Sequence, residues 1–156
     1  MRFIHSLLES DADRTHVAQL IENLETSGAI VAESVGRLGV FKARLHYERR
    51  EWDEAIKAAD AVITDTQARP TDQLRALMLK ALSLSPTDTQ RLTLLETAEV
   101  QLDDPDTEID ENERLLLRGE VLNNLGREYM RHKPEKAEAT LQKAYQLNRD
   151  SGARSL

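Results

Sequence analysis

The chain has 156 residues, a formal net charge of −7 at pH 7 and no cysteine. The length fits one domain with a substantial core. The negative charge argues against a general binder of nucleic acid or of anionic membranes, and the missing cysteine excludes disulfides, thiolate metal sites and a cysteine nucleophile. Leu, Ala, Glu and Arg abound while aromatic residues are few, so we expect an all-helical fold. No apolar run is long enough for a signal or transmembrane segment, which makes the cytoplasm the expected location.

Residues 1–31 predict an N-terminal helical segment. Its apolar stripe consists of Val17, Leu20, Ile21 and Leu24, and Ser27-Gly28 is a stop signal. A helix followed by the short apolar run Ala29-Ile30-Val31 is also typical of the end of a winged-helix domain. Residues 1–32 nevertheless contain two Arg and five acidic residues, which disfavours DNA binding. A helical cap on the helices that follow is the preferred interpretation.

Residues 33–66 predict the first of three helix pairs. Leu38, Phe41 and Leu45 line one helix at helical spacing. The run Trp52-Asp53-Glu54-Ala55-Ile56 opens the second helix, and Ala59, Val62 and Ile63 continue it. We expect Trp52 to be a packed anchor rather than part of a cofactor site.

Residues 71–103 predict the second helix pair. Thr71 is the expected cap of its first helix, and Thr87 with Gln90 forms a predicted capping box before the second. The apolar stripes of the two helices are Leu74, Leu77, Ala81 and Leu84, then Leu92, Leu95, Ala98 and Leu102. From Val62 to Ala98 is 36 residues, close to a repeat length of about 34.

Residues 103–110 form an acidic loop that lengthens the next interval, because Ala98 and Ala144 are 46 residues apart. The stretch from Gln101 to Glu113 holds seven acidic residues and no basic ones. A calcium loop is disfavoured, since Ile109 stands where the sharp turn needs Gly and Leu115 replaces the bidentate Glu. We expect a solvated connector whose last acids stabilise the start of a helix near Glu111, with no metal bound.

Residues 113–150 predict the third helix pair. In the first helix Leu122, Leu125, Gly126 and Tyr129 recur at steps of three and four. Lys133-Pro134 ends it, because the residue before a proline is disfavoured in the α region while proline suits the first helical position. The second helix carries Ala137, Leu141, Ala144 and Tyr145 on one face, and Gly126 is expected where the two backbones approach closely. We expect Leu125, Tyr129, Ala137 and Leu141 to be buried.

At these last residues the chain resembles the tetratricopeptide repeat. That family's pattern of a bulky residue, Leu-Gly, an aromatic residue, a short turn and Ala, bulky, Ala is met by Leu122, Leu125-Gly126, Tyr129, Ala137, Leu141 and Ala144. The turn is one residue shorter than in the family, and the proline often found after the second helix is absent. The resemblance implies a right-handed α-solenoid of about three helical hairpins with an N-terminal helical cap. It also implies a scaffold that binds other proteins.

In this family the first helices line a concave groove that binds partner segments. By that analogy the groove holds five arginines, two asparagines and two further contact residues. The predicted partner-binding residues are Arg37, Arg44, Tyr47, Arg75, Asn123, Asn124, Arg127, Met130 and Arg131. Arginine binds carboxylates bidentately, which favours an acidic or amphipathic partner segment. The alternative is that these arginines only pair with neighbouring Glu side chains.

Nothing in the sequence assembles catalytic chemistry. The four histidines show no pair at metal-ligand spacing, and Gly36 and Gly39 lack the Lys-Ser/Thr sequel of a phosphate loop. We therefore expect no enzyme and no cofactor. The leading hypothesis is a protein-interaction scaffold. The alternative is a regulatory or sensor segment of a larger machine with a winged-helix-like N-terminal remnant.

The C-terminal edge of the third helix pair is expected to leave apolar surface around Leu141, Tyr145 and Leu147. Repeat stacks need polar outer faces at their ends, and large exposed apolar patches mark contact sites. We expect a second copy of the chain, another protein or a downstream segment to cover this edge, so a homodimer is one predicted state.

Overall fold

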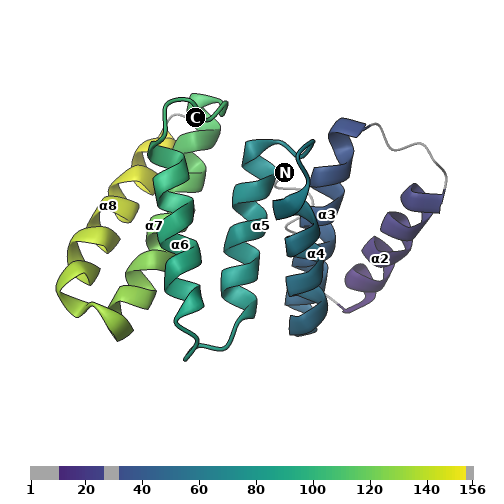
Figure 1. The fold of residues 1–156 in the computed structure, drawn as a ribbon, viewed down its shortest axis with the longest axis horizontal. Coiled ribbons are helices and arrows are strands. Elements are labelled where there is room, and N and C mark those ends of the chain that lie inside the picture. The colour runs from purple at the N-terminus through teal and green to yellow at the C-terminus, as the bar shows by residue number, and fades with distance from the viewer. Residues whose placement is uncertain (1–10, 27–31, 154–156) are drawn as a thin grey trace. The chain divides into compact units, whose positions relative to one another are not determined.

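The computed structural model describes residues 11–26 and 32–153, which form seven helices and no strand (Figure 1). The helices are α2 (Asp11–Thr26), α3 (Ala32–Glu48), α4 (Trp52–Thr64), α5 (Pro70–Ser83), α6 (Gln90–Asp103), α7 (Glu111–His132) and α8 (Pro134–Ala153). The expected all-helical class is confirmed. Contacts divide the chain into two compact units, Met1–Leu79 (unit 1) and Lys80–Leu156 (unit 2), and the division falls inside α5.

Unit 1 is built on the hairpin of α3 and α4. Its core cluster combines side chains of α3, α4 and α5, namely Val40, Ala43, Ala59, Val62, Ala76 and Leu79. Small residues let α3 and α4 approach closely, and a Cβ on Gly39 would collide with the Val62 side chain. The helix pair predicted for residues 33–66 from helical spacing is therefore confirmed.

Helix α2 packs against α3 through Ile21 and Leu45, which form a second, smaller cluster. Leu20, expected in the same apolar stripe, is instead exposed. The predicted stop at Ser27-Gly28 agrees with the end of α2 at Thr26. Residues 1–10 and the apolar run 29–31, which the winged-helix comparison also uses, lie outside the described residues.

The turn between α3 and α4 corrects the expectation for Trp52. This side chain is 43% exposed, so it is not a buried anchor. It contacts the Tyr47 ring edge to face, with the ring centroids 5.6 Å apart. Trp52 is the first residue of α4, next to the turn that follows Glu48, and only part of its ring is covered there.

Two expected helix caps are wrong. Helix α5 begins at Pro70, so Thr71 lies within its first turn and is buried rather than capping it. Before α6, Thr87 contacts Ser85 instead of closing a capping box, and Asp88 accepts the backbone N–H of Gln90 at 2.8 Å. In both places a neighbouring residue, Pro70 or Asp88, satisfies the helix start better than the predicted threonine.

Unit 2 contains α6, α7 and α8, with α7 in contact with both of the others. Its most buried side chains are leucines of α6 and α7: Leu95, Leu102, Leu117, Leu122 and Leu125. Leu125, Tyr129 and Ala137 are buried as expected. Leu141 is only half-buried, which corrects its assignment as a full core residue.

Helices α7 and α8 form a hairpin with a single residue, Lys133, between them. Lys133 lies outside the α region (φ −146°, ψ 65°), in line with the restriction that a following proline imposes. The helices approach closely at Gly126, where a Cβ would lie 2.6 Å from two carbon atoms of Leu141. The sequence prediction of a short-turn hairpin with a glycine at the crossing is confirmed.

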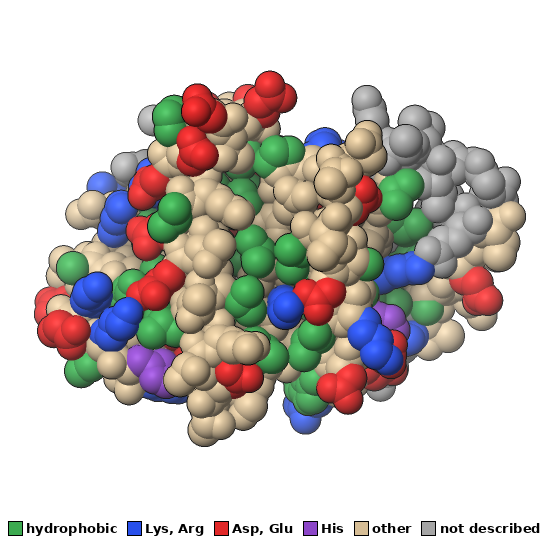
Figure 2. Space-filling view, in the orientation of Figure 1, with side chains coloured by type: hydrophobic (Ala, Val, Ile, Leu, Met, Phe, Trp, Pro, Cys, Tyr) green, Lys and Arg blue, Asp and Glu red, His purple; other side chains and the backbone are tan. Residues whose placement is uncertain are grey.

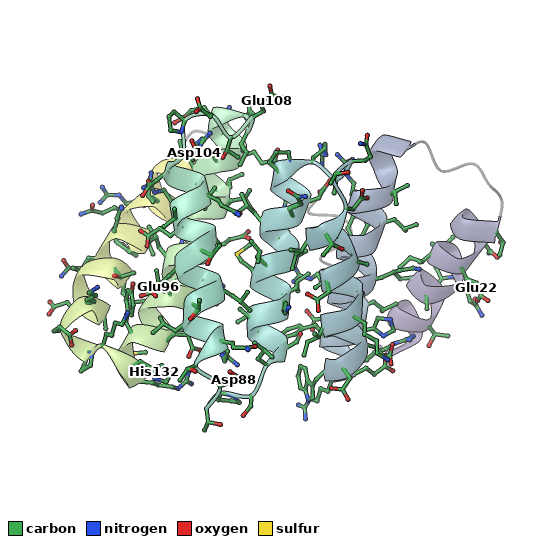
Figure 3. All side chains as sticks on the ribbon, viewed as in Figure 1. Glu22, Asp88, Glu96, Asp104, Glu108 and His132 are labelled. Carbon is green, nitrogen blue, oxygen red and sulfur yellow. The ribbon has the colours of Figure 1, made fainter. Side chains whose placement is uncertain are left out.

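The acidic loop between α6 and α7 is held by one arginine that the sequence analysis did not single out. The Arg114 guanidinium donates to the carbonyl oxygens of Leu102, Asp104 and Thr107. Asp110 caps α7 by accepting from the backbone N–H groups of Asn112 and Glu113, as expected for an acid at this position. Figure 3 shows Asp104 and Glu108 on this loop at one end of unit 2. Within the described residues no three His, Asp or Glu side chains gather as a metal site.

Candidate partner-binding surface

Five of the predicted binding residues lie on the side of α7 that faces away from its buried leucine stripe. Asn123 and Asn124 are half-buried, whereas Arg127, Met130 and Arg131 are exposed. Met130 exposes 57% of its surface, which is high for a methionine in a folded protein. We call this exposed side of α7, defined by these five residues, the α7 face.

The two arginines of the α7 face differ in what they contact. Arg131 donates to the Glu128 carboxylate at 2.9 Å, so it matches the alternative in which arginines pair with neighbouring acids. Arg127 forms no hydrogen bond or ion pair with any residue that the structure describes. The Asn124 side chain donates to the backbone carbonyl of Glu120, one turn earlier. Arg127 is therefore the cation of this face with its donors open to a ligand.

The other four predicted binding residues belong to unit 1. Arg37 on α3 is exposed, and Arg44 pairs with Glu48 at 3.6 Å one turn later. Tyr47 is half-buried against Trp52, and Arg75 is half-buried on α5. These residues and the α7 face lie in different units, so a continuous groove through all nine remains a prediction.

A hollow lies beside the α7 face, where α8 runs next to Met130. Its volume is about 570 Å³, and it is lined by Met130, Glu138, Leu141, Gln142, Tyr145, Gln146 and Arg149. Tyr145 exposes 68% of its surface, the same fraction as Val100 and more than the other large apolar side chains in the described part of the chain. We call it the α8 hollow. The helical spacing predicted exposed apolar surface at Leu141 and Tyr145. It did not predict that Glu138, Gln142, Gln146 and Arg149 line the same hollow.

Beneath the end of the α7 face, Glu96 of α6 ties the helices together. It accepts hydrogen bonds from the Lys133 ammonium at 2.7 Å and from the Tyr129 hydroxyl at 3.1 Å. The hydrogen bond from Lys133 lowers the pKa of Glu96. Burial, with the hydrogen bond to Glu96, raises the pKa of Tyr129 to about 12. Figure 3 labels Glu96 on α6 and His132 at the end of α7.

Figure 2 shows acidic and basic side chains interspersed with apolar ones over α8, without a field of one sign. No described helix has an apolar stretch sufficient to cross a membrane. Comparisons with protein families, with curated proteins and with solved structures return no match for this chain.

Proposed function

We propose that this chain is a protein-interaction module of the tetratricopeptide type, which binds a segment of a partner protein on the α7 face. The observation that carries the proposal is the pairing of an exposed Met130 with the open Arg127 guanidinium on one rigid helix. An apolar contact next to a bidentate carboxylate donor suits a partner segment that carries both an apolar side chain and an acidic one. The proposed role is binding, not catalysis, and its proposed compartment is the cytoplasm.

The α7 face is supported by the packing behind it. The opposite side of α7 is buried through Leu117, Leu122 and Leu125, so the helix does not need to order when a ligand arrives. A preorganised helix loses little conformational entropy on binding, which favours affinity for a short segment. Asn123 adds a side-chain amide one turn from Arg127, within reach of a peptide backbone.

The proposal extends to the architecture. The hairpins α3–α4 and α7–α8 share a small residue at the helix crossing, Ala43 in one and Gly126 in the other. We propose that α5 and α6 complete a third pair, that the three pairs stack as a right-handed solenoid, and that α2 caps it. The alternative of a winged-helix-like joint at residues 1–31 depends in part on residues outside the described ranges, and no observation favours it.

The proposal can be tested by selecting, from a library of displayed random peptides, those that bind the full chain. The proposal expects enrichment of peptides that combine Asp or Glu with an apolar residue. For an enriched peptide, Arg127→Ala should weaken binding roughly tenfold, as expected for the loss of charge-assisted hydrogen bonds. Added salt should weaken it as well, because exposed charges are screened.

Lys57→Ala is the matched control, because Lys57 is an exposed cation on α4 that pairs with Glu54, one turn away. It should leave peptide affinity unchanged. Enrichment of peptides without acidic residues would contradict the proposal. So would peptide binding that persists in Arg127→Ala at the affinity of the unaltered chain.

A further inference from the structure

The two hairpins that the structure describes differ in what covers one of their faces. In unit 1, α5 packs Ala76 and Leu79 against the α3–α4 hairpin, where Tyr47 and Ile63 also lie. If Ala43 is aligned with Gly126 and Ala55 with Ala137, then Tyr47 corresponds to Met130 and Ile63 to Tyr145. The face that α5 covers in the first hairpin is therefore the face of the α8 hollow in the last.

No described residue of unit 2 covers that face. Met130 and Tyr145 remain largely exposed, and Leu141 is half-buried. A helix is the shape that fits, because a helix fills the same position in unit 1. The remaining question is which helix, and the polar residues of the α8 hollow bear on it.

Six residues of α8 line the hollow, and their spacing reads the same in both directions. They are Glu138, Leu141, Gln142, Tyr145, Gln146 and Arg149, at steps of three, one, three, one and three. The acidic residue stands at one end of this row and the basic residue at the other. With a rise of 1.5 Å per residue, the two charged positions are about 16 Å apart along the helix axis. A row of this kind is complementary to a reversed copy of itself.

We propose that a second copy of this chain occupies the α8 hollow, with the two α8 helices antiparallel about a two-fold axis. This arrangement places Glu138 opposite Arg149 of the other copy, twice. Gln142 then faces Tyr145, and Leu141 faces Gln146, also twice each. The interface is isologous, since each contact occurs in two symmetric copies, which is the commonest way for soluble proteins to form dimers.

The charges select both the occupant and its direction. A parallel pair of α8 helices would set Glu138 against Glu138 and Arg149 against Arg149, which is repulsive at both ends. A partner segment of one sign would meet one of the two charges as a like charge. The antiparallel copy sets each charge against an opposite one, next to the Gln142 amide that donates to Glu138 at 3.2 Å within the chain, while Tyr145 and Leu141 lose contact with water. Only Met130 is shared with the α7 face, so the dimer does not depend on the proposed peptide binding.

The experiment measures the mass of the full chain by sedimentation velocity over a concentration series into the hundred-micromolar range. The proposal expects a dimer at the upper end for the unaltered chain. Glu138→Arg and Arg149→Glu should each raise the dimer dissociation constant roughly tenfold or more, because two attractive pairs become repulsive. The double variant Glu138→Arg/Arg149→Glu should return to dimerisation near that of the unaltered chain.

A mixture of the two single variants gives the sharpest result. One variant carries Arg at both positions and the other carries Glu at both, so the antiparallel heterodimer regains both attractive pairs. The mixture should therefore dimerise although neither variant does so alone. Circular dichroism of each variant checks that helicity is kept, and Glu54→Arg on α4 is the control for a charge reversal outside the interface.

Three results would overturn the proposal. A chain that remains monomeric through the whole concentration series has no such interface. A dimer that is indifferent to both single charge reversals uses another surface. Failure of both the double variant and the mixture to restore the dimer would mean that Glu138 and Arg149 do not face each other.

Discussion

Arg91 of α6 and Glu128 of α7 are 37 positions apart and form an ion pair in the interior of unit 2. The Arg91 guanidinium lies 2.9 Å from Glu128 Oε1 and also donates to the Leu84 carbonyl at 2.8 Å. Glu128 is only 2% exposed. Arg131 shares the same carboxylate oxygen, and His132 lies 3.8 Å from the other one. This charge cluster joins α6 to α7.

Removal of Arg91 should be costly. Arg91→Met should lower the free energy of unfolding by about 3 kcal/mol, because it leaves a buried carboxylate with only Arg131 as a close partner. The additional change Glu128→Leu should recover most of that loss, since it also removes the buried carboxylate between α6 and α7. Urea denaturation followed by circular dichroism measures both variants. Arg127→Met, on the exposed side of α7, is the control and should stay within about 0.5 kcal/mol of the unaltered chain. A double variant less stable than Arg91→Met would contradict the account.

Gly126→Ala should destabilise the α7–α8 hairpin. The added Cβ would lie 2.6 Å from two Leu141 carbons, so we expect a loss of about 1–3 kcal/mol from overpacking. Leu141→Ala alone should cost less than a fully buried leucine would, because this side chain is half-buried. In the double variant the two effects should partly cancel, which a thermodynamic cycle of urea denaturation measures.

Gly119→Ala provides the matched control on the same helix. Its Cβ would meet only the end of the exposed Asn148 side chain, which can move aside. The gain in helix propensity, about 1 kcal/mol for Ala over Gly, should make this change neutral or stabilising. Equal destabilisation by Gly119→Ala and Gly126→Ala would show that the close contact with Leu141 is not the cause.

The Tyr129 hydroxyl should make stability fall in alkali. Its pKa is raised to about 12 from 10.0 in a model compound, so the neutral phenol is favoured in the folded chain. This contribution to stability is fully present below pH 10 and is lost as the pH rises through about 12. A difference of about two pKa units corresponds to roughly 2–3 kcal/mol at most. Tyr129→Phe should flatten the decline of unfolding free energy over this range. It should also remove the last step of tyrosinate absorbance in a spectrophotometric titration. If Tyr129→Phe showed the same decline of unfolding free energy and the same absorbance titration as the unaltered chain, Tyr129 would not be the group that lowers stability in alkali.

Arg114 should control access to the acidic loop. Arg114→Ala removes donors to three carbonyls of residues 102–107, so the loop should open more often. Limited proteolysis by an enzyme that cleaves after Asp and Glu should then cut residues 103–110 several-fold faster. Glu120→Gln, an exposed residue outside the loop, is the control for a change of charge that leaves every cleavage site of the loop in place. A cleavage rate that does not change in Arg114→Ala would mean that other contacts hold the loop.

Helix positions and hairpins could be predicted from the sequence because they depend on local signals. The steps of three and four from Leu122 to Tyr129, followed by Lys133-Pro134, fix both the buried side of α7 and its end. The start of α6 was mispredicted because several polar residues compete for its backbone N–H groups, and Asp88 rather than Thr87 accepts from Gln90. The burial of Trp52 was overestimated because a residue type does not reveal whether a neighbour covers it.

The candidate surfaces were only partly predictable, for a different reason. Helical spacing placed Arg127, Met130 and Arg131 on one side of α7 correctly. It could not show that Arg131 pairs with Glu128 whereas Arg127 does not. Partners far apart in sequence, such as Arg91 with Glu128, leave no mark in local periodicity. Arg114 was missed for a related reason, since its acceptors are backbone carbonyls, which every residue has.

The single-residue connection at Lys133 has a consequence for the order of folding. Because α7 and α8 are separated by almost no loop, bringing them together loses little chain entropy, and their contacts connect residues close in sequence. The Arg91–Glu128 pair requires a much longer segment to close first. The α7–α8 hairpin is therefore the natural nucleus of unit 2, and α6 joins a surface that already exists.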